Sequence, residues 1–398
     1  MARWFFVMVF SMLCLTCCCG TSATASAPCE AIRAPLEVVT FNAGLAPGIV
    51  PYATPRAPSV VHTLQTTDWD IMCLQEIWKD EDRDAIVNAL HLTPEHVLFA
   101  DTRGKNEFPN TRCDALQVIP IVSCILAHCG ADSTDERAAV CALDQCKREL
   151  LLMYLAGGKS CLNCLLATAG ESLDRSSATC LGSGASRLYG GRNGVILMSK
   201  TPLRNTAVID IPSSGANRVG LFATVDVPGL SAPLNVACTH LSSPAQIPPT
   251  QTGYADWESE QRAQLEAIST VLLARAAGGP AILVGDLNTG DGSHGLTGTS
   301  PSVWDDARRL GYRDAMATAG ASFCTECGEN TLAPTPNEDA TIDHVLVAPD
   351  LGSGQEKLTP TCAQRLFTDK VVIRGYNGEP VRTNLSDHYG FKAKFNVR

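Results

Sequence analysis

The chain has 398 residues, of which 45% are hydrophobic and 18% are charged, and this is an ordinary composition for a globular protein with a large core. The composition excludes a disordered, collagenous or coiled-coil protein. The 31 basic and 41 acidic residues give a formal net charge of −10, which disfavours a protein that binds by neutralising many nucleic-acid phosphates. An enzyme that binds a single phosphate is compatible with this charge.

The first 25 residues have the pattern of a secretory signal peptide. An apolar run from Trp4 to Cys19 follows Arg3, and Ala23-Thr24-Ala25 offers a cleavage site made of small residues. We therefore expect residues 1–25 to be removed and residues 26–398 to form a secreted or extracytoplasmic protein. The run is short for a membrane span and lacks a basic stop-transfer flank, which disfavours a transmembrane helix. A lipid anchor on Cys17 to Cys19 stays open.

The cysteine count agrees with an oxidising compartment. Eighteen cysteines are far more than a cytosolic protein usually carries, and removal of residues 1–25 leaves 18 − 4 = 14 of them. Cys73 and Cys238 lie among apolar residues inside strand-like runs, so we expect both to be free thiols. The other twelve should form six disulfides, with Cys324 joined to Cys327, or one of these two joined to Cys362.

Short apolar runs typical of β-strands alternate with helical patterns along the mature chain. The clearest helical pattern covers Asp256 to Ala277, with Asp256 placed to cap its start and Gly278-Gly279 to end it. Most of the strand-like runs are almost continuously apolar, as in sheets buried on both faces. We predict a layered α/β architecture with strands at Leu36 to Phe41, Asp70 to Leu74, Val195 to Ser199, Leu221 to Val227, Leu234 to Thr239, Ala281 to Val284, Ile342 to Ala348 and Tyr389 to Val397.

Residues 104–190 interrupt this alternation, between a strand near His96 to Thr102 and the strand that begins at Asn193. The segment from Cys113 to Cys180 holds eight cysteines and is rich in Leu and Ala, with helical patterns at Val118 to His128 and Glu149 to Leu155. We predict an inserted helical unit with four internal disulfides, because a small unit with a thin core needs such cross-links.

Two alternatives concern what this insertion does. A zinc site built on Cys161-x-x-Cys164 would need reduced thiols and a second ligand pair, and the secreted context disfavours it. As a disulfide-linked unit whose two ends re-enter the fold at neighbouring strands, the insertion is either a structural cap over a sheet edge or a lid whose apolar side chains touch lipid. Leu-rich helices mostly pack against protein, which favours the cap. A lid would use apolar side chains such as Leu151, Leu152, Leu165 and Leu166.

Three strand-like runs end in polar residues of the kind that bind metal and phosphate. Asn42 follows the first run, Gln75 and Glu76 follow the second, and His240 ends a later one. Each signal is weak alone, because an Asn after a strand usually makes a turn and a lone His is usually structural. A carboxylate among large apolar groups, such as Glu76, is costly unless it is paired or bound to a metal such as Mg²⁺.

Further polar residues follow the later strands. Asp286 and Asn288 come after a very apolar run and should project to the same side. Asp343-His344 and Asp387-His388 are Asp-His dipeptides, but neighbours on a strand point apart, so we do not expect a pair inside either dipeptide. Asp343 is instead expected to orient His388, which would leave that imidazole as a general base for water.

The order Asn, Glu, His, Asp-x-Asn, Asp-His and Ser-Asp-His, each on its own strand, is more specific than any single motif. It resembles the endonuclease/exonuclease/phosphatase superfamily, the DNase I-like fold, over the mature chain outside the insertion. The resemblance implies an α/β (α+β) four-layer sandwich of two mixed β-sheets flanked by helices, and cleavage of a phosphoester with Mg²⁺. The matching residues are Asn42, Glu76, His240, Asp286, Asn288, Asp343, Asp387 and His388.

Flanking residues resemble one branch of the superfamily, the neutral and bacterial sphingomyelinases. Leu74-Gln75-Glu76-Ile77-Trp78 has an aromatic residue two positions after the Glu, where DNase I-like nucleases tend to have Arg. The segments Asn193 to Lys200, Thr239 to Ser242 and Glu260 to Leu265 are also similar to that branch.

The resemblance implies a metal-binding set formed by Asn42, Glu76 and Asp387. The expected ion is Mg²⁺, with Mn²⁺ or Ca²⁺ as alternatives, placed on a non-bridging phosphate oxygen. Asp387 either completes this set or holds the loop that carries His388.

The resemblance also implies a catalytic set formed by His240, Asp286, Asn288, Asp343 and His388. His388, oriented by Asp343, would take the proton from the attacking water. Asp286 and Asn288 would position that water or the phosphorus centre, with Asn288 donating to an equatorial oxygen. His240 would donate to the phosphate or assist the leaving oxygen.

The sequence therefore predicts a secreted, Mg²⁺-dependent phosphodiesterase that hydrolyses a phospholipid headgroup at a membrane surface, as a sphingomyelinase C converts sphingomyelin to ceramide and phosphocholine. A secreted DNase I-like endonuclease is one alternative, and the acidic balance with no Lys/Arg cluster disfavours nucleic acid as its partner. An inactive binding protein on the same fold is the other, and the full set of site residues opposes it. No protein partner follows from the sequence.

Overall fold

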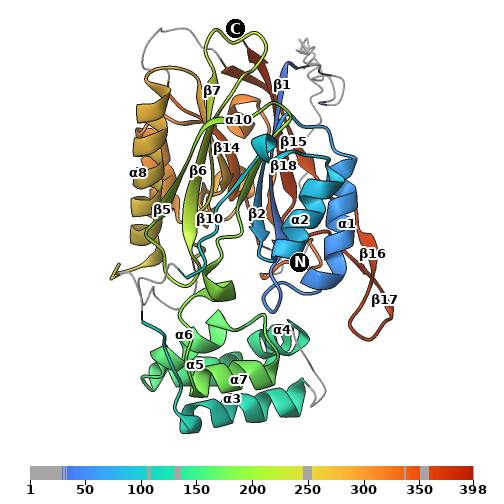
Figure 1. The fold of residues 1–398 in the computed structure, drawn as a ribbon, viewed down its shortest axis with the longest axis vertical. Coiled ribbons are helices and arrows are strands. Elements are labelled where there is room, and N and C mark those ends of the chain that lie inside the picture. Colours follow the sequence, from blue (N-terminus) through green and yellow to red (C-terminus); the bar gives the residue numbers. More distant parts are fainter. Residues whose placement is uncertain are drawn as a thin grey trace, which may run out of the picture.

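The computed structural model describes residues 34–104, 109–129, 136–244, 253–335, 338–349 and 358–397, together with Cys29 and Ile32. The predicted signal peptide and the lipid-anchor alternative lie outside the described residues. Two six-stranded sheets form the centre of the protein (Figure 1).

The first sheet has the strand order β15-β18-β1-β2-β4-β3. Only β1 and β2 pair in parallel, and their neighbours are antiparallel, so the sheet is mixed. Its strands are β1 (Leu36–Leu45), β2 (Ile71–Ile77), β3 (Val97–Phe99), β4 (Ile196–Ser199), β15 (Leu358–Leu366) and β18 (Gly390–Val397).

The second sheet has the order β11-β14-β8-β7-β6-β5 and is also mixed, because β7 and β8 are parallel. Its strands are β5 (Arg204–Ile211), β6 (Arg218–Val225), β7 (Leu234–His240), β8 (Ala281–Asp286), β11 (Arg313–Asp314) and β14 (Asp343–Val347). Short two-stranded pairs add β9 (Gly290–Asp291) with β10 (Gly298–Thr299), β12 (Glu326–Cys327) with β13 (Asp339–Ala340), and β16 (Val371–Arg374) with β17 (Pro380–Thr383).

Helices cover the outer face of each sheet, which gives the predicted four layers. α1 (Ala53–Gln65) and α2 (Asp80–Ala89) pack on the first sheet, and α8 (Trp257–Ala276) packs on the second (Figure 1). α9 (Pro301–Arg309) also packs on the second sheet. A third apolar cluster fills the space between the two sheets. The remaining helical segments of the sandwich are α10 (Ala315–Thr318) and the short 3-10 turns Pro94–His96, Leu188–Gly191 and Ser293–Gly295.

The predicted strands and the long helix are confirmed, with shifts of a few residues at their ends. The side chain of Asp256 accepts a hydrogen bond from the Ser259 N–H at 2.7 Å, so it caps α8 as expected. Strands β5 and β15 were not predicted, because both carry many exposed or half-exposed polar residues and lack a continuous apolar run.

The cysteine-rich insertion forms five helices between β3 and β4 and lies below the sandwich in Figure 1. Four internal disulfides link them, as predicted, by joining Cys113 to Cys161, Cys124 to Cys146, Cys129 to Cys141 and Cys164 to Cys180. Cys161 and Cys164 are thus both oxidised, which contradicts the zinc alternative. The helices are α3 (Ala115–His128), α4 (Glu136–Gln145), α5 (Lys147–Leu155), α6 (Lys159–Ala167) and α7 (Leu173–Leu181).

The expectation that Cys73 and Cys238 are free thiols is wrong. They form a disulfide with Cα atoms 5.6 Å apart, a separation typical of such bonds. Cys73 lies on β2 of the first sheet and Cys238 on β7 of the second, and both are fully buried in the core between the sheets. Apolar neighbours gave no sign that these two strands face each other across the core. Cys324 pairs with Cys327 as expected, and Cys362 pairs with Cys29.

Within the described residues, no helix is both long and apolar enough to span a membrane.

The Cys73–Cys238 disulfide should contribute strongly to stability, because it closes a loop with a sequence separation of 165 residues. Replacing both cysteines with Ala should lower the free energy of unfolding in denaturant titrations by about 2–4 kcal/mol. Removal of the Cys129–Cys141 disulfide, which has a sequence separation of 12, should lower the free energy of unfolding by less. Peptide mass mapping that found Cys73 and Cys238 as free thiols in the native protein would contradict the assignment.

Candidate active site

The predicted site residues come from both sheets and meet at one edge of the sandwich. Strands β1, β2, β7 and β8 end there, and β14 and β18 begin there. One cleft is lined by Asn42, Glu76, His240, Asp286, Asn288, Asp387 and His388, and Asp343 contacts His388 directly behind it. The structure therefore brings all eight predicted residues together, although they span most of the chain.

The Asp286 carboxylate lies at the centre of this cluster. Its Oδ2 accepts a hydrogen bond from Asn42 Nδ2 at 2.9 Å and lies 3.3 Å from His240 Nε2 and 4.0 Å from His388 Nε2. Its Oδ1 accepts from the Asn288 backbone N–H at 2.9 Å. Burial alone would raise the pKa of Asp286, but His240, His388 and Asn42 together lower it well below its usual range. Asp286 is therefore a buried carboxylate that stays charged.

His240 is a buried, neutral imidazole. Burial and the nearby charge of Arg218 lower the pKa of His240 to about 4. With Nε2 facing Asp286, its Nδ1 is a buried atom without a hydrogen-bond partner among the described residues. In this tautomer Nε2 donates to Asp286 and Nδ1 carries no proton. To donate to a phosphate through Nδ1, as the sequence predicts, His240 would have to gain a second proton or adopt the other tautomer.

The predicted pair between Asp343 and His388 is present. His388 Nδ1 lies 2.8 Å from Asp343 Oδ2, and both side chains are buried. Burial lowers the pKa of His388, but the adjacent Asp343 carboxylate outweighs it and raises the pKa well above its usual value. Asp343 fixes the ring so that Nε2 points towards the cleft and Asp286, which is the orientation a general base requires.

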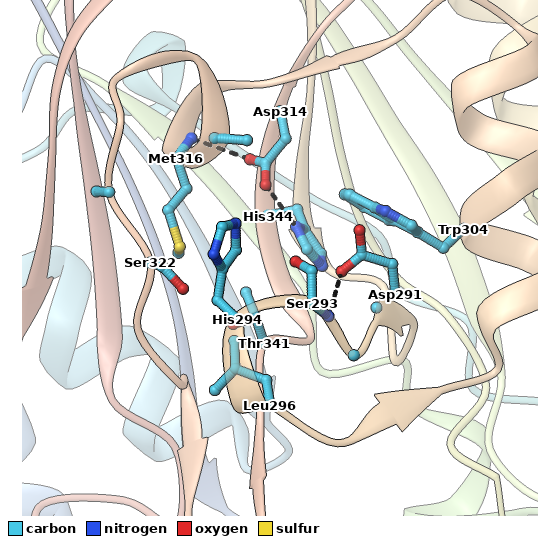
Figure 2. A pocket seen from close by; sticks show the side chains of 14 residues that line it. Asp291, Ser293, His294, Leu296, Trp304, Asp314, Met316, Ser322, Thr341 and His344 are labelled. Carbon is cyan, nitrogen blue, oxygen red and sulfur yellow. Dashed lines mark hydrogen bonds and ion pairs between the residues drawn. The ribbon is translucent and has the colours of Figure 1, made fainter.

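His344, the neighbour of Asp343, points away from the cleft, as the strand geometry predicts. Its ring packs against Trp304 with centroids 4.3 Å apart, and its Nε2 donates to the Thr289 carbonyl at 2.8 Å. Figure 2 shows His344 in a separate small pocket, with its Nδ1 directed towards Asp314 at 3.8 Å. The contacts of His344 are therefore those of a structural residue.

The residues expected to bind metal fit a hard divalent ion. Glu76 and Asp387 face the same cleft, and Glu76 Oε2 is a buried oxygen without a hydrogen-bond partner in the described residues. Burial raises the pKa of Glu76 to about 7, and the charge of Asp387 adds to this rise. Two carboxylates in such an arrangement are stabilised by a cation between them, and oxygen donors suit Mg²⁺.

Asn42 contributes to this group in a second way. Its Oδ1 accepts from the Gly44 N–H at 3.0 Å, which leaves one lone pair for an ion, while its Nδ2 is committed to Asp286. Gly44 has a φ of +53°, and a Cβ atom there would overlap the Asp387 carboxylate. Only glycine allows the end of β1, where the pairing with β2 is irregular, to approach Asp387 so closely.

Polar residues buried on α8 hold the loops that carry the site. Gln261 Nε2 donates to the carbonyl oxygens of Ser242 and Asn288, at 2.6 and 3.0 Å. Glu260 accepts from the Ser242 hydroxyl at 2.6 Å. Asn288 has a φ of +50° and donates from Nδ2 to the Leu241 carbonyl at 3.1 Å, so it lies in a turn after β8. The segment noted for its family resemblance therefore positions the loops after β7 and β8.

Sequence reasoning missed Arg218, at the start of β6. Its side chain lines the cleft and is 8% exposed, yet its Nε and Nη1 have no hydrogen-bond partner among the described residues. A buried guanidinium with unpaired donors is costly unless a ligand anion completes it. A single Arg before an apolar strand carries no sequence signal of its own, so only the fold identifies it.

Arg56 was also missed, and it fixes the two segments that carry the expected metal ligands. It is fully buried on α1, and its Nη1 donates to the carbonyls of Ala43 and Leu385 at 3.2 and 2.6 Å. Its Nη2 donates to the Gly44 carbonyl at 2.5 Å. These bonds tie the end of β1 after Asn42 to the segment before Asp387.

The chain matches the model of the Endonuclease/Exonuclease/phosphatase family over residues 39–388. No sequence among the curated proteins matches it. Among solved structures, it is similar to Staphylococcus aureus beta toxin with bound magnesium ions, at 13% identity and a TM-score of 0.53 over 90% of this chain and 99% of that one.

Two further structures are similar. Sphingomyelinase C from Streptomyces griseocarneus has 15% identity and a TM-score of 0.50 over 91% of this chain and 99% of that one. Truncated Caenorhabditis elegans TDP2 has 14% identity and a TM-score of 0.49 over 91% and 98%. The family model covers all eight predicted site residues, so the chain belongs to the endonuclease/exonuclease/phosphatase family and is a metal-dependent phosphodiesterase with a DNase I-like fold.

Proposed function

We propose that this protein is a secreted, Mg²⁺-dependent phospholipid phosphodiesterase of the sphingomyelinase C type, which hydrolyses sphingomyelin to ceramide and phosphocholine at a membrane surface. Seven disulfides among the described residues suit an oxidising compartment outside the cytosol. The flanking sequences and the resemblance to sphingomyelinase C agree with this substrate.

One observation carries the choice of a lipid substrate. Of twelve large apolar side chains that are exposed in the described part of the chain, seven lie on α3, α5 and α7 of the insertion, including Leu116 at 82% and Leu155 at 69%. The insertion projects from the same end of the sandwich as the cleft (Figure 1). Apolar groups gathered in this way favour contact with a partner over water, and a lipid surface is such a partner. This distribution favours the lid over the purely structural cap. Of the four leucines predicted for a lid, Leu151 and Leu152 are exposed, whereas Leu165 and Leu166 pack against the core of the insertion, so that part of the prediction is wrong.

In this proposal the chain's own residues perform the proton transfer. In its neutral form, His388, held by Asp343, takes the proton from the attacking water through Nε2. Asp286 and Asn288 hold the water and the phosphorus centre in line, and Arg218 donates to a phosphate oxygen.

Glu76 and Asp387, with Asn42, would hold the ion. When bound, a divalent cation stabilises the charge that develops on the phosphate.

A secreted nuclease is the second candidate, because the name of the matching family includes endonucleases and exonucleases. The net charge of −10 disfavours a nucleic-acid substrate, which an enzyme normally binds through a basic surface. The exposed apolar residues of the insertion have no use in binding a phosphate backbone.

Activity should require a divalent ion, and Glu76→Gln and His388→Ala should each lower kcat by at least about a hundredfold. Both residues lie at the site and outside the apolar core, and Glu76→Gln, which keeps the shape of the side chain, should change thermal unfolding little. Steady-state assays with added Mg²⁺ and with EDTA measure this. Full activity in excess EDTA would refute the metal assignment.

Arg218→Met should raise KM and lower kcat/KM by about a hundredfold, because it removes a charged donor to the phosphate. Arg218→Lys should recover part of the loss, since it restores the charge but not the planar donor set. Binding of inorganic phosphate, followed by calorimetry, should weaken in parallel. Unchanged phosphate affinity in Arg218→Met would contradict this role.

The lipid proposal predicts a selective defect in a triple variant with Leu116→Ser, Leu151→Ser and Leu155→Ser. Turnover of sphingomyelin vesicles should fall by at least about tenfold, because each exposed Leu that enters lipid contributes roughly 1.5–3 kcal/mol. Turnover of a water-soluble phosphodiester should not change. Val372→Ser is the matched control, because Val372 is 67% exposed but lies on β16.

If the triple variant hydrolyses vesicles as fast as the unmodified protein, the structural cap remains as the explanation of the insertion. Faster cleavage of duplex DNA than of vesicles by the unmodified protein would favour the nuclease.

A further inference from the structure

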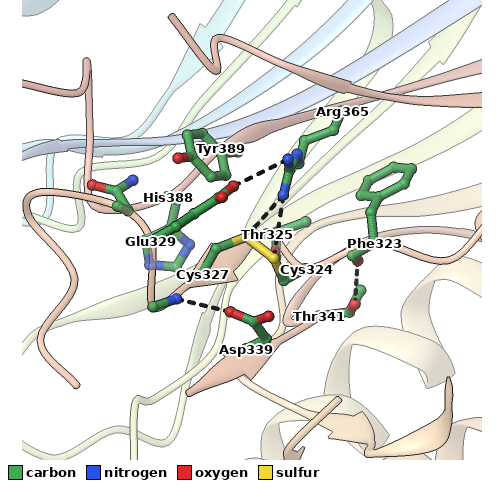
Figure 3. Close-up of a disulfide and its surroundings, with 12 residues drawn as sticks. Phe323, Cys324, Thr325, Cys327, Glu329, Asp339, Thr341, Arg365, His388 and Tyr389 are labelled. Atoms are coloured by element: carbon green, nitrogen blue, oxygen red, sulfur yellow. Dashed lines mark hydrogen bonds and ion pairs between the residues drawn. A yellow bond between two sulfur atoms is a disulfide. The ribbon is translucent and has the colours of Figure 1, made fainter. Parts of the chain in front are cut away.

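A small disulfide loop lies directly behind the Asp343–His388 pair. A disulfide joins Cys324 to Cys327, three positions later (Figure 3). The loop that it closes contains Thr325 and Glu326. Glu326 pairs with His388 in an isolated antiparallel bridge. The loop therefore contacts the segment that carries the proposed general base.

Thr325 is fully buried and contacts the backbone segments that carry Asp343 and His388. Its Oγ1 accepts hydrogen bonds from the backbone N–H groups of Ile342 and Asp343, both at 3.1 Å. Its own N–H donates to the Ala340 carbonyl at 2.9 Å, and its carbonyl accepts from the Tyr389 N–H at 2.7 Å. One residue thus connects the backbone at Asp343 to the backbone directly after His388.

The disulfide limits how far this residue can move. β12 pairs with β13 in register, with Glu326 opposite Ala340 and Cys327 opposite Asp339. Arg365 on β15 donates from Nη1 to both sulfur atoms at 3.3 Å, and its guanidinium lies over the Tyr389 ring at 4.8 Å (Figure 3). These contacts anchor the loop to the first sheet, while Asp343 belongs to the second.

We propose that Thr325, fixed by the Cys324–Cys327 disulfide, is a positioning residue that sets the distance between Asp343 and His388. The backbone of Asp343 is held by the Thr325 hydroxyl and the backbone after His388 by the Thr325 carbonyl. A displacement of Thr325 therefore changes the geometry of the pair without removing either partner. Misplacement of a catalytic group by about 1 Å can cost a hundredfold in rate. This inference rests on the proposed role of the Asp343–His388 pair.

Thr325→Val keeps the shape of the side chain but removes the acceptor from two buried N–H groups. It should lower kcat by about ten to a hundredfold, with KM changed less than about twofold. Thr325→Ser keeps the hydroxyl and should stay within about threefold of the unmodified enzyme. Steady-state kinetics on a water-soluble phosphodiester measures both variants without the membrane step.

A double-mutant cycle separates positioning from a general structural role. In an Asp343→Asn background, Thr325→Val should lower kcat by less than about threefold, because the group through which Thr325 acts is already gone. Equal factors in both backgrounds, or an unchanged kcat in Thr325→Val, would overturn the inference. If Asp343→Asn and His388→Ala both keep full activity, the proposed function fails instead.

The disulfide provides a second variant if Thr325→Val does not fold. Cys324→Ser with Cys327→Ser should lower kcat on the same substrate by about tenfold, and this loss should also shrink in the Asp343→Asn background. The matched control is Cys129→Ser with Cys141→Ser, which removes a disulfide in the insertion and should keep kcat within about twofold. A Cys324/Cys327 variant with the activity of that control would overturn the inference.

Discussion

The site depends on the interactions that pair the buried carboxylate of Asp286. Asn42 approaches it from the first sheet, and His240 and the Asn288 N–H approach it from the second. A buried charge of this kind is strongly destabilising unless it is fully paired, so the two sheets have to pack in the one register that supplies these partners. The same packing brings His388 within 4.0 Å of Asp286, and thereby creates the cleft in which a phosphodiester can react.

The surrounding structure limits movement between the sheets by covalent and ionic means. The Cys73–Cys238 disulfide joins β2 to β7 through the core, below the residues that line the cleft. Arg56 binds the two segments next to the expected metal ligands, and it is a cation placed near carboxylates that would otherwise repel each other. Rigid positioning of this kind is what acid–base chemistry on a phosphate requires, because the reacting groups have to be aligned before the water attacks.

The sequence was most informative where strand geometry decides the outcome. Alternation along a strand correctly separated Asp343 from His344, the predicted cross-pair of Asp343 with His388 is present, and the apolar strand ends located the cleft. It failed where the partner lies far away in the chain and has no local pattern. Cys73 and Cys238 look like core residues in isolation, and Arg218 becomes a phosphate-binding candidate only when β6 is placed beside β7. The polar edge strands β5 and β15 were missed because an exposed strand has no continuous apolar run.

The central claim is that a water molecule, activated at this two-sheet site, attacks the phosphorus atom of a phospholipid headgroup. Hydrolysis of sphingomyelin vesicles in water enriched with oxygen-18, followed by mass spectrometry of the products, tests this claim most directly. The account predicts phosphocholine that carries one oxygen-18 atom, together with unlabelled ceramide. Label in the ceramide, or no formation of phosphocholine, would contradict the account.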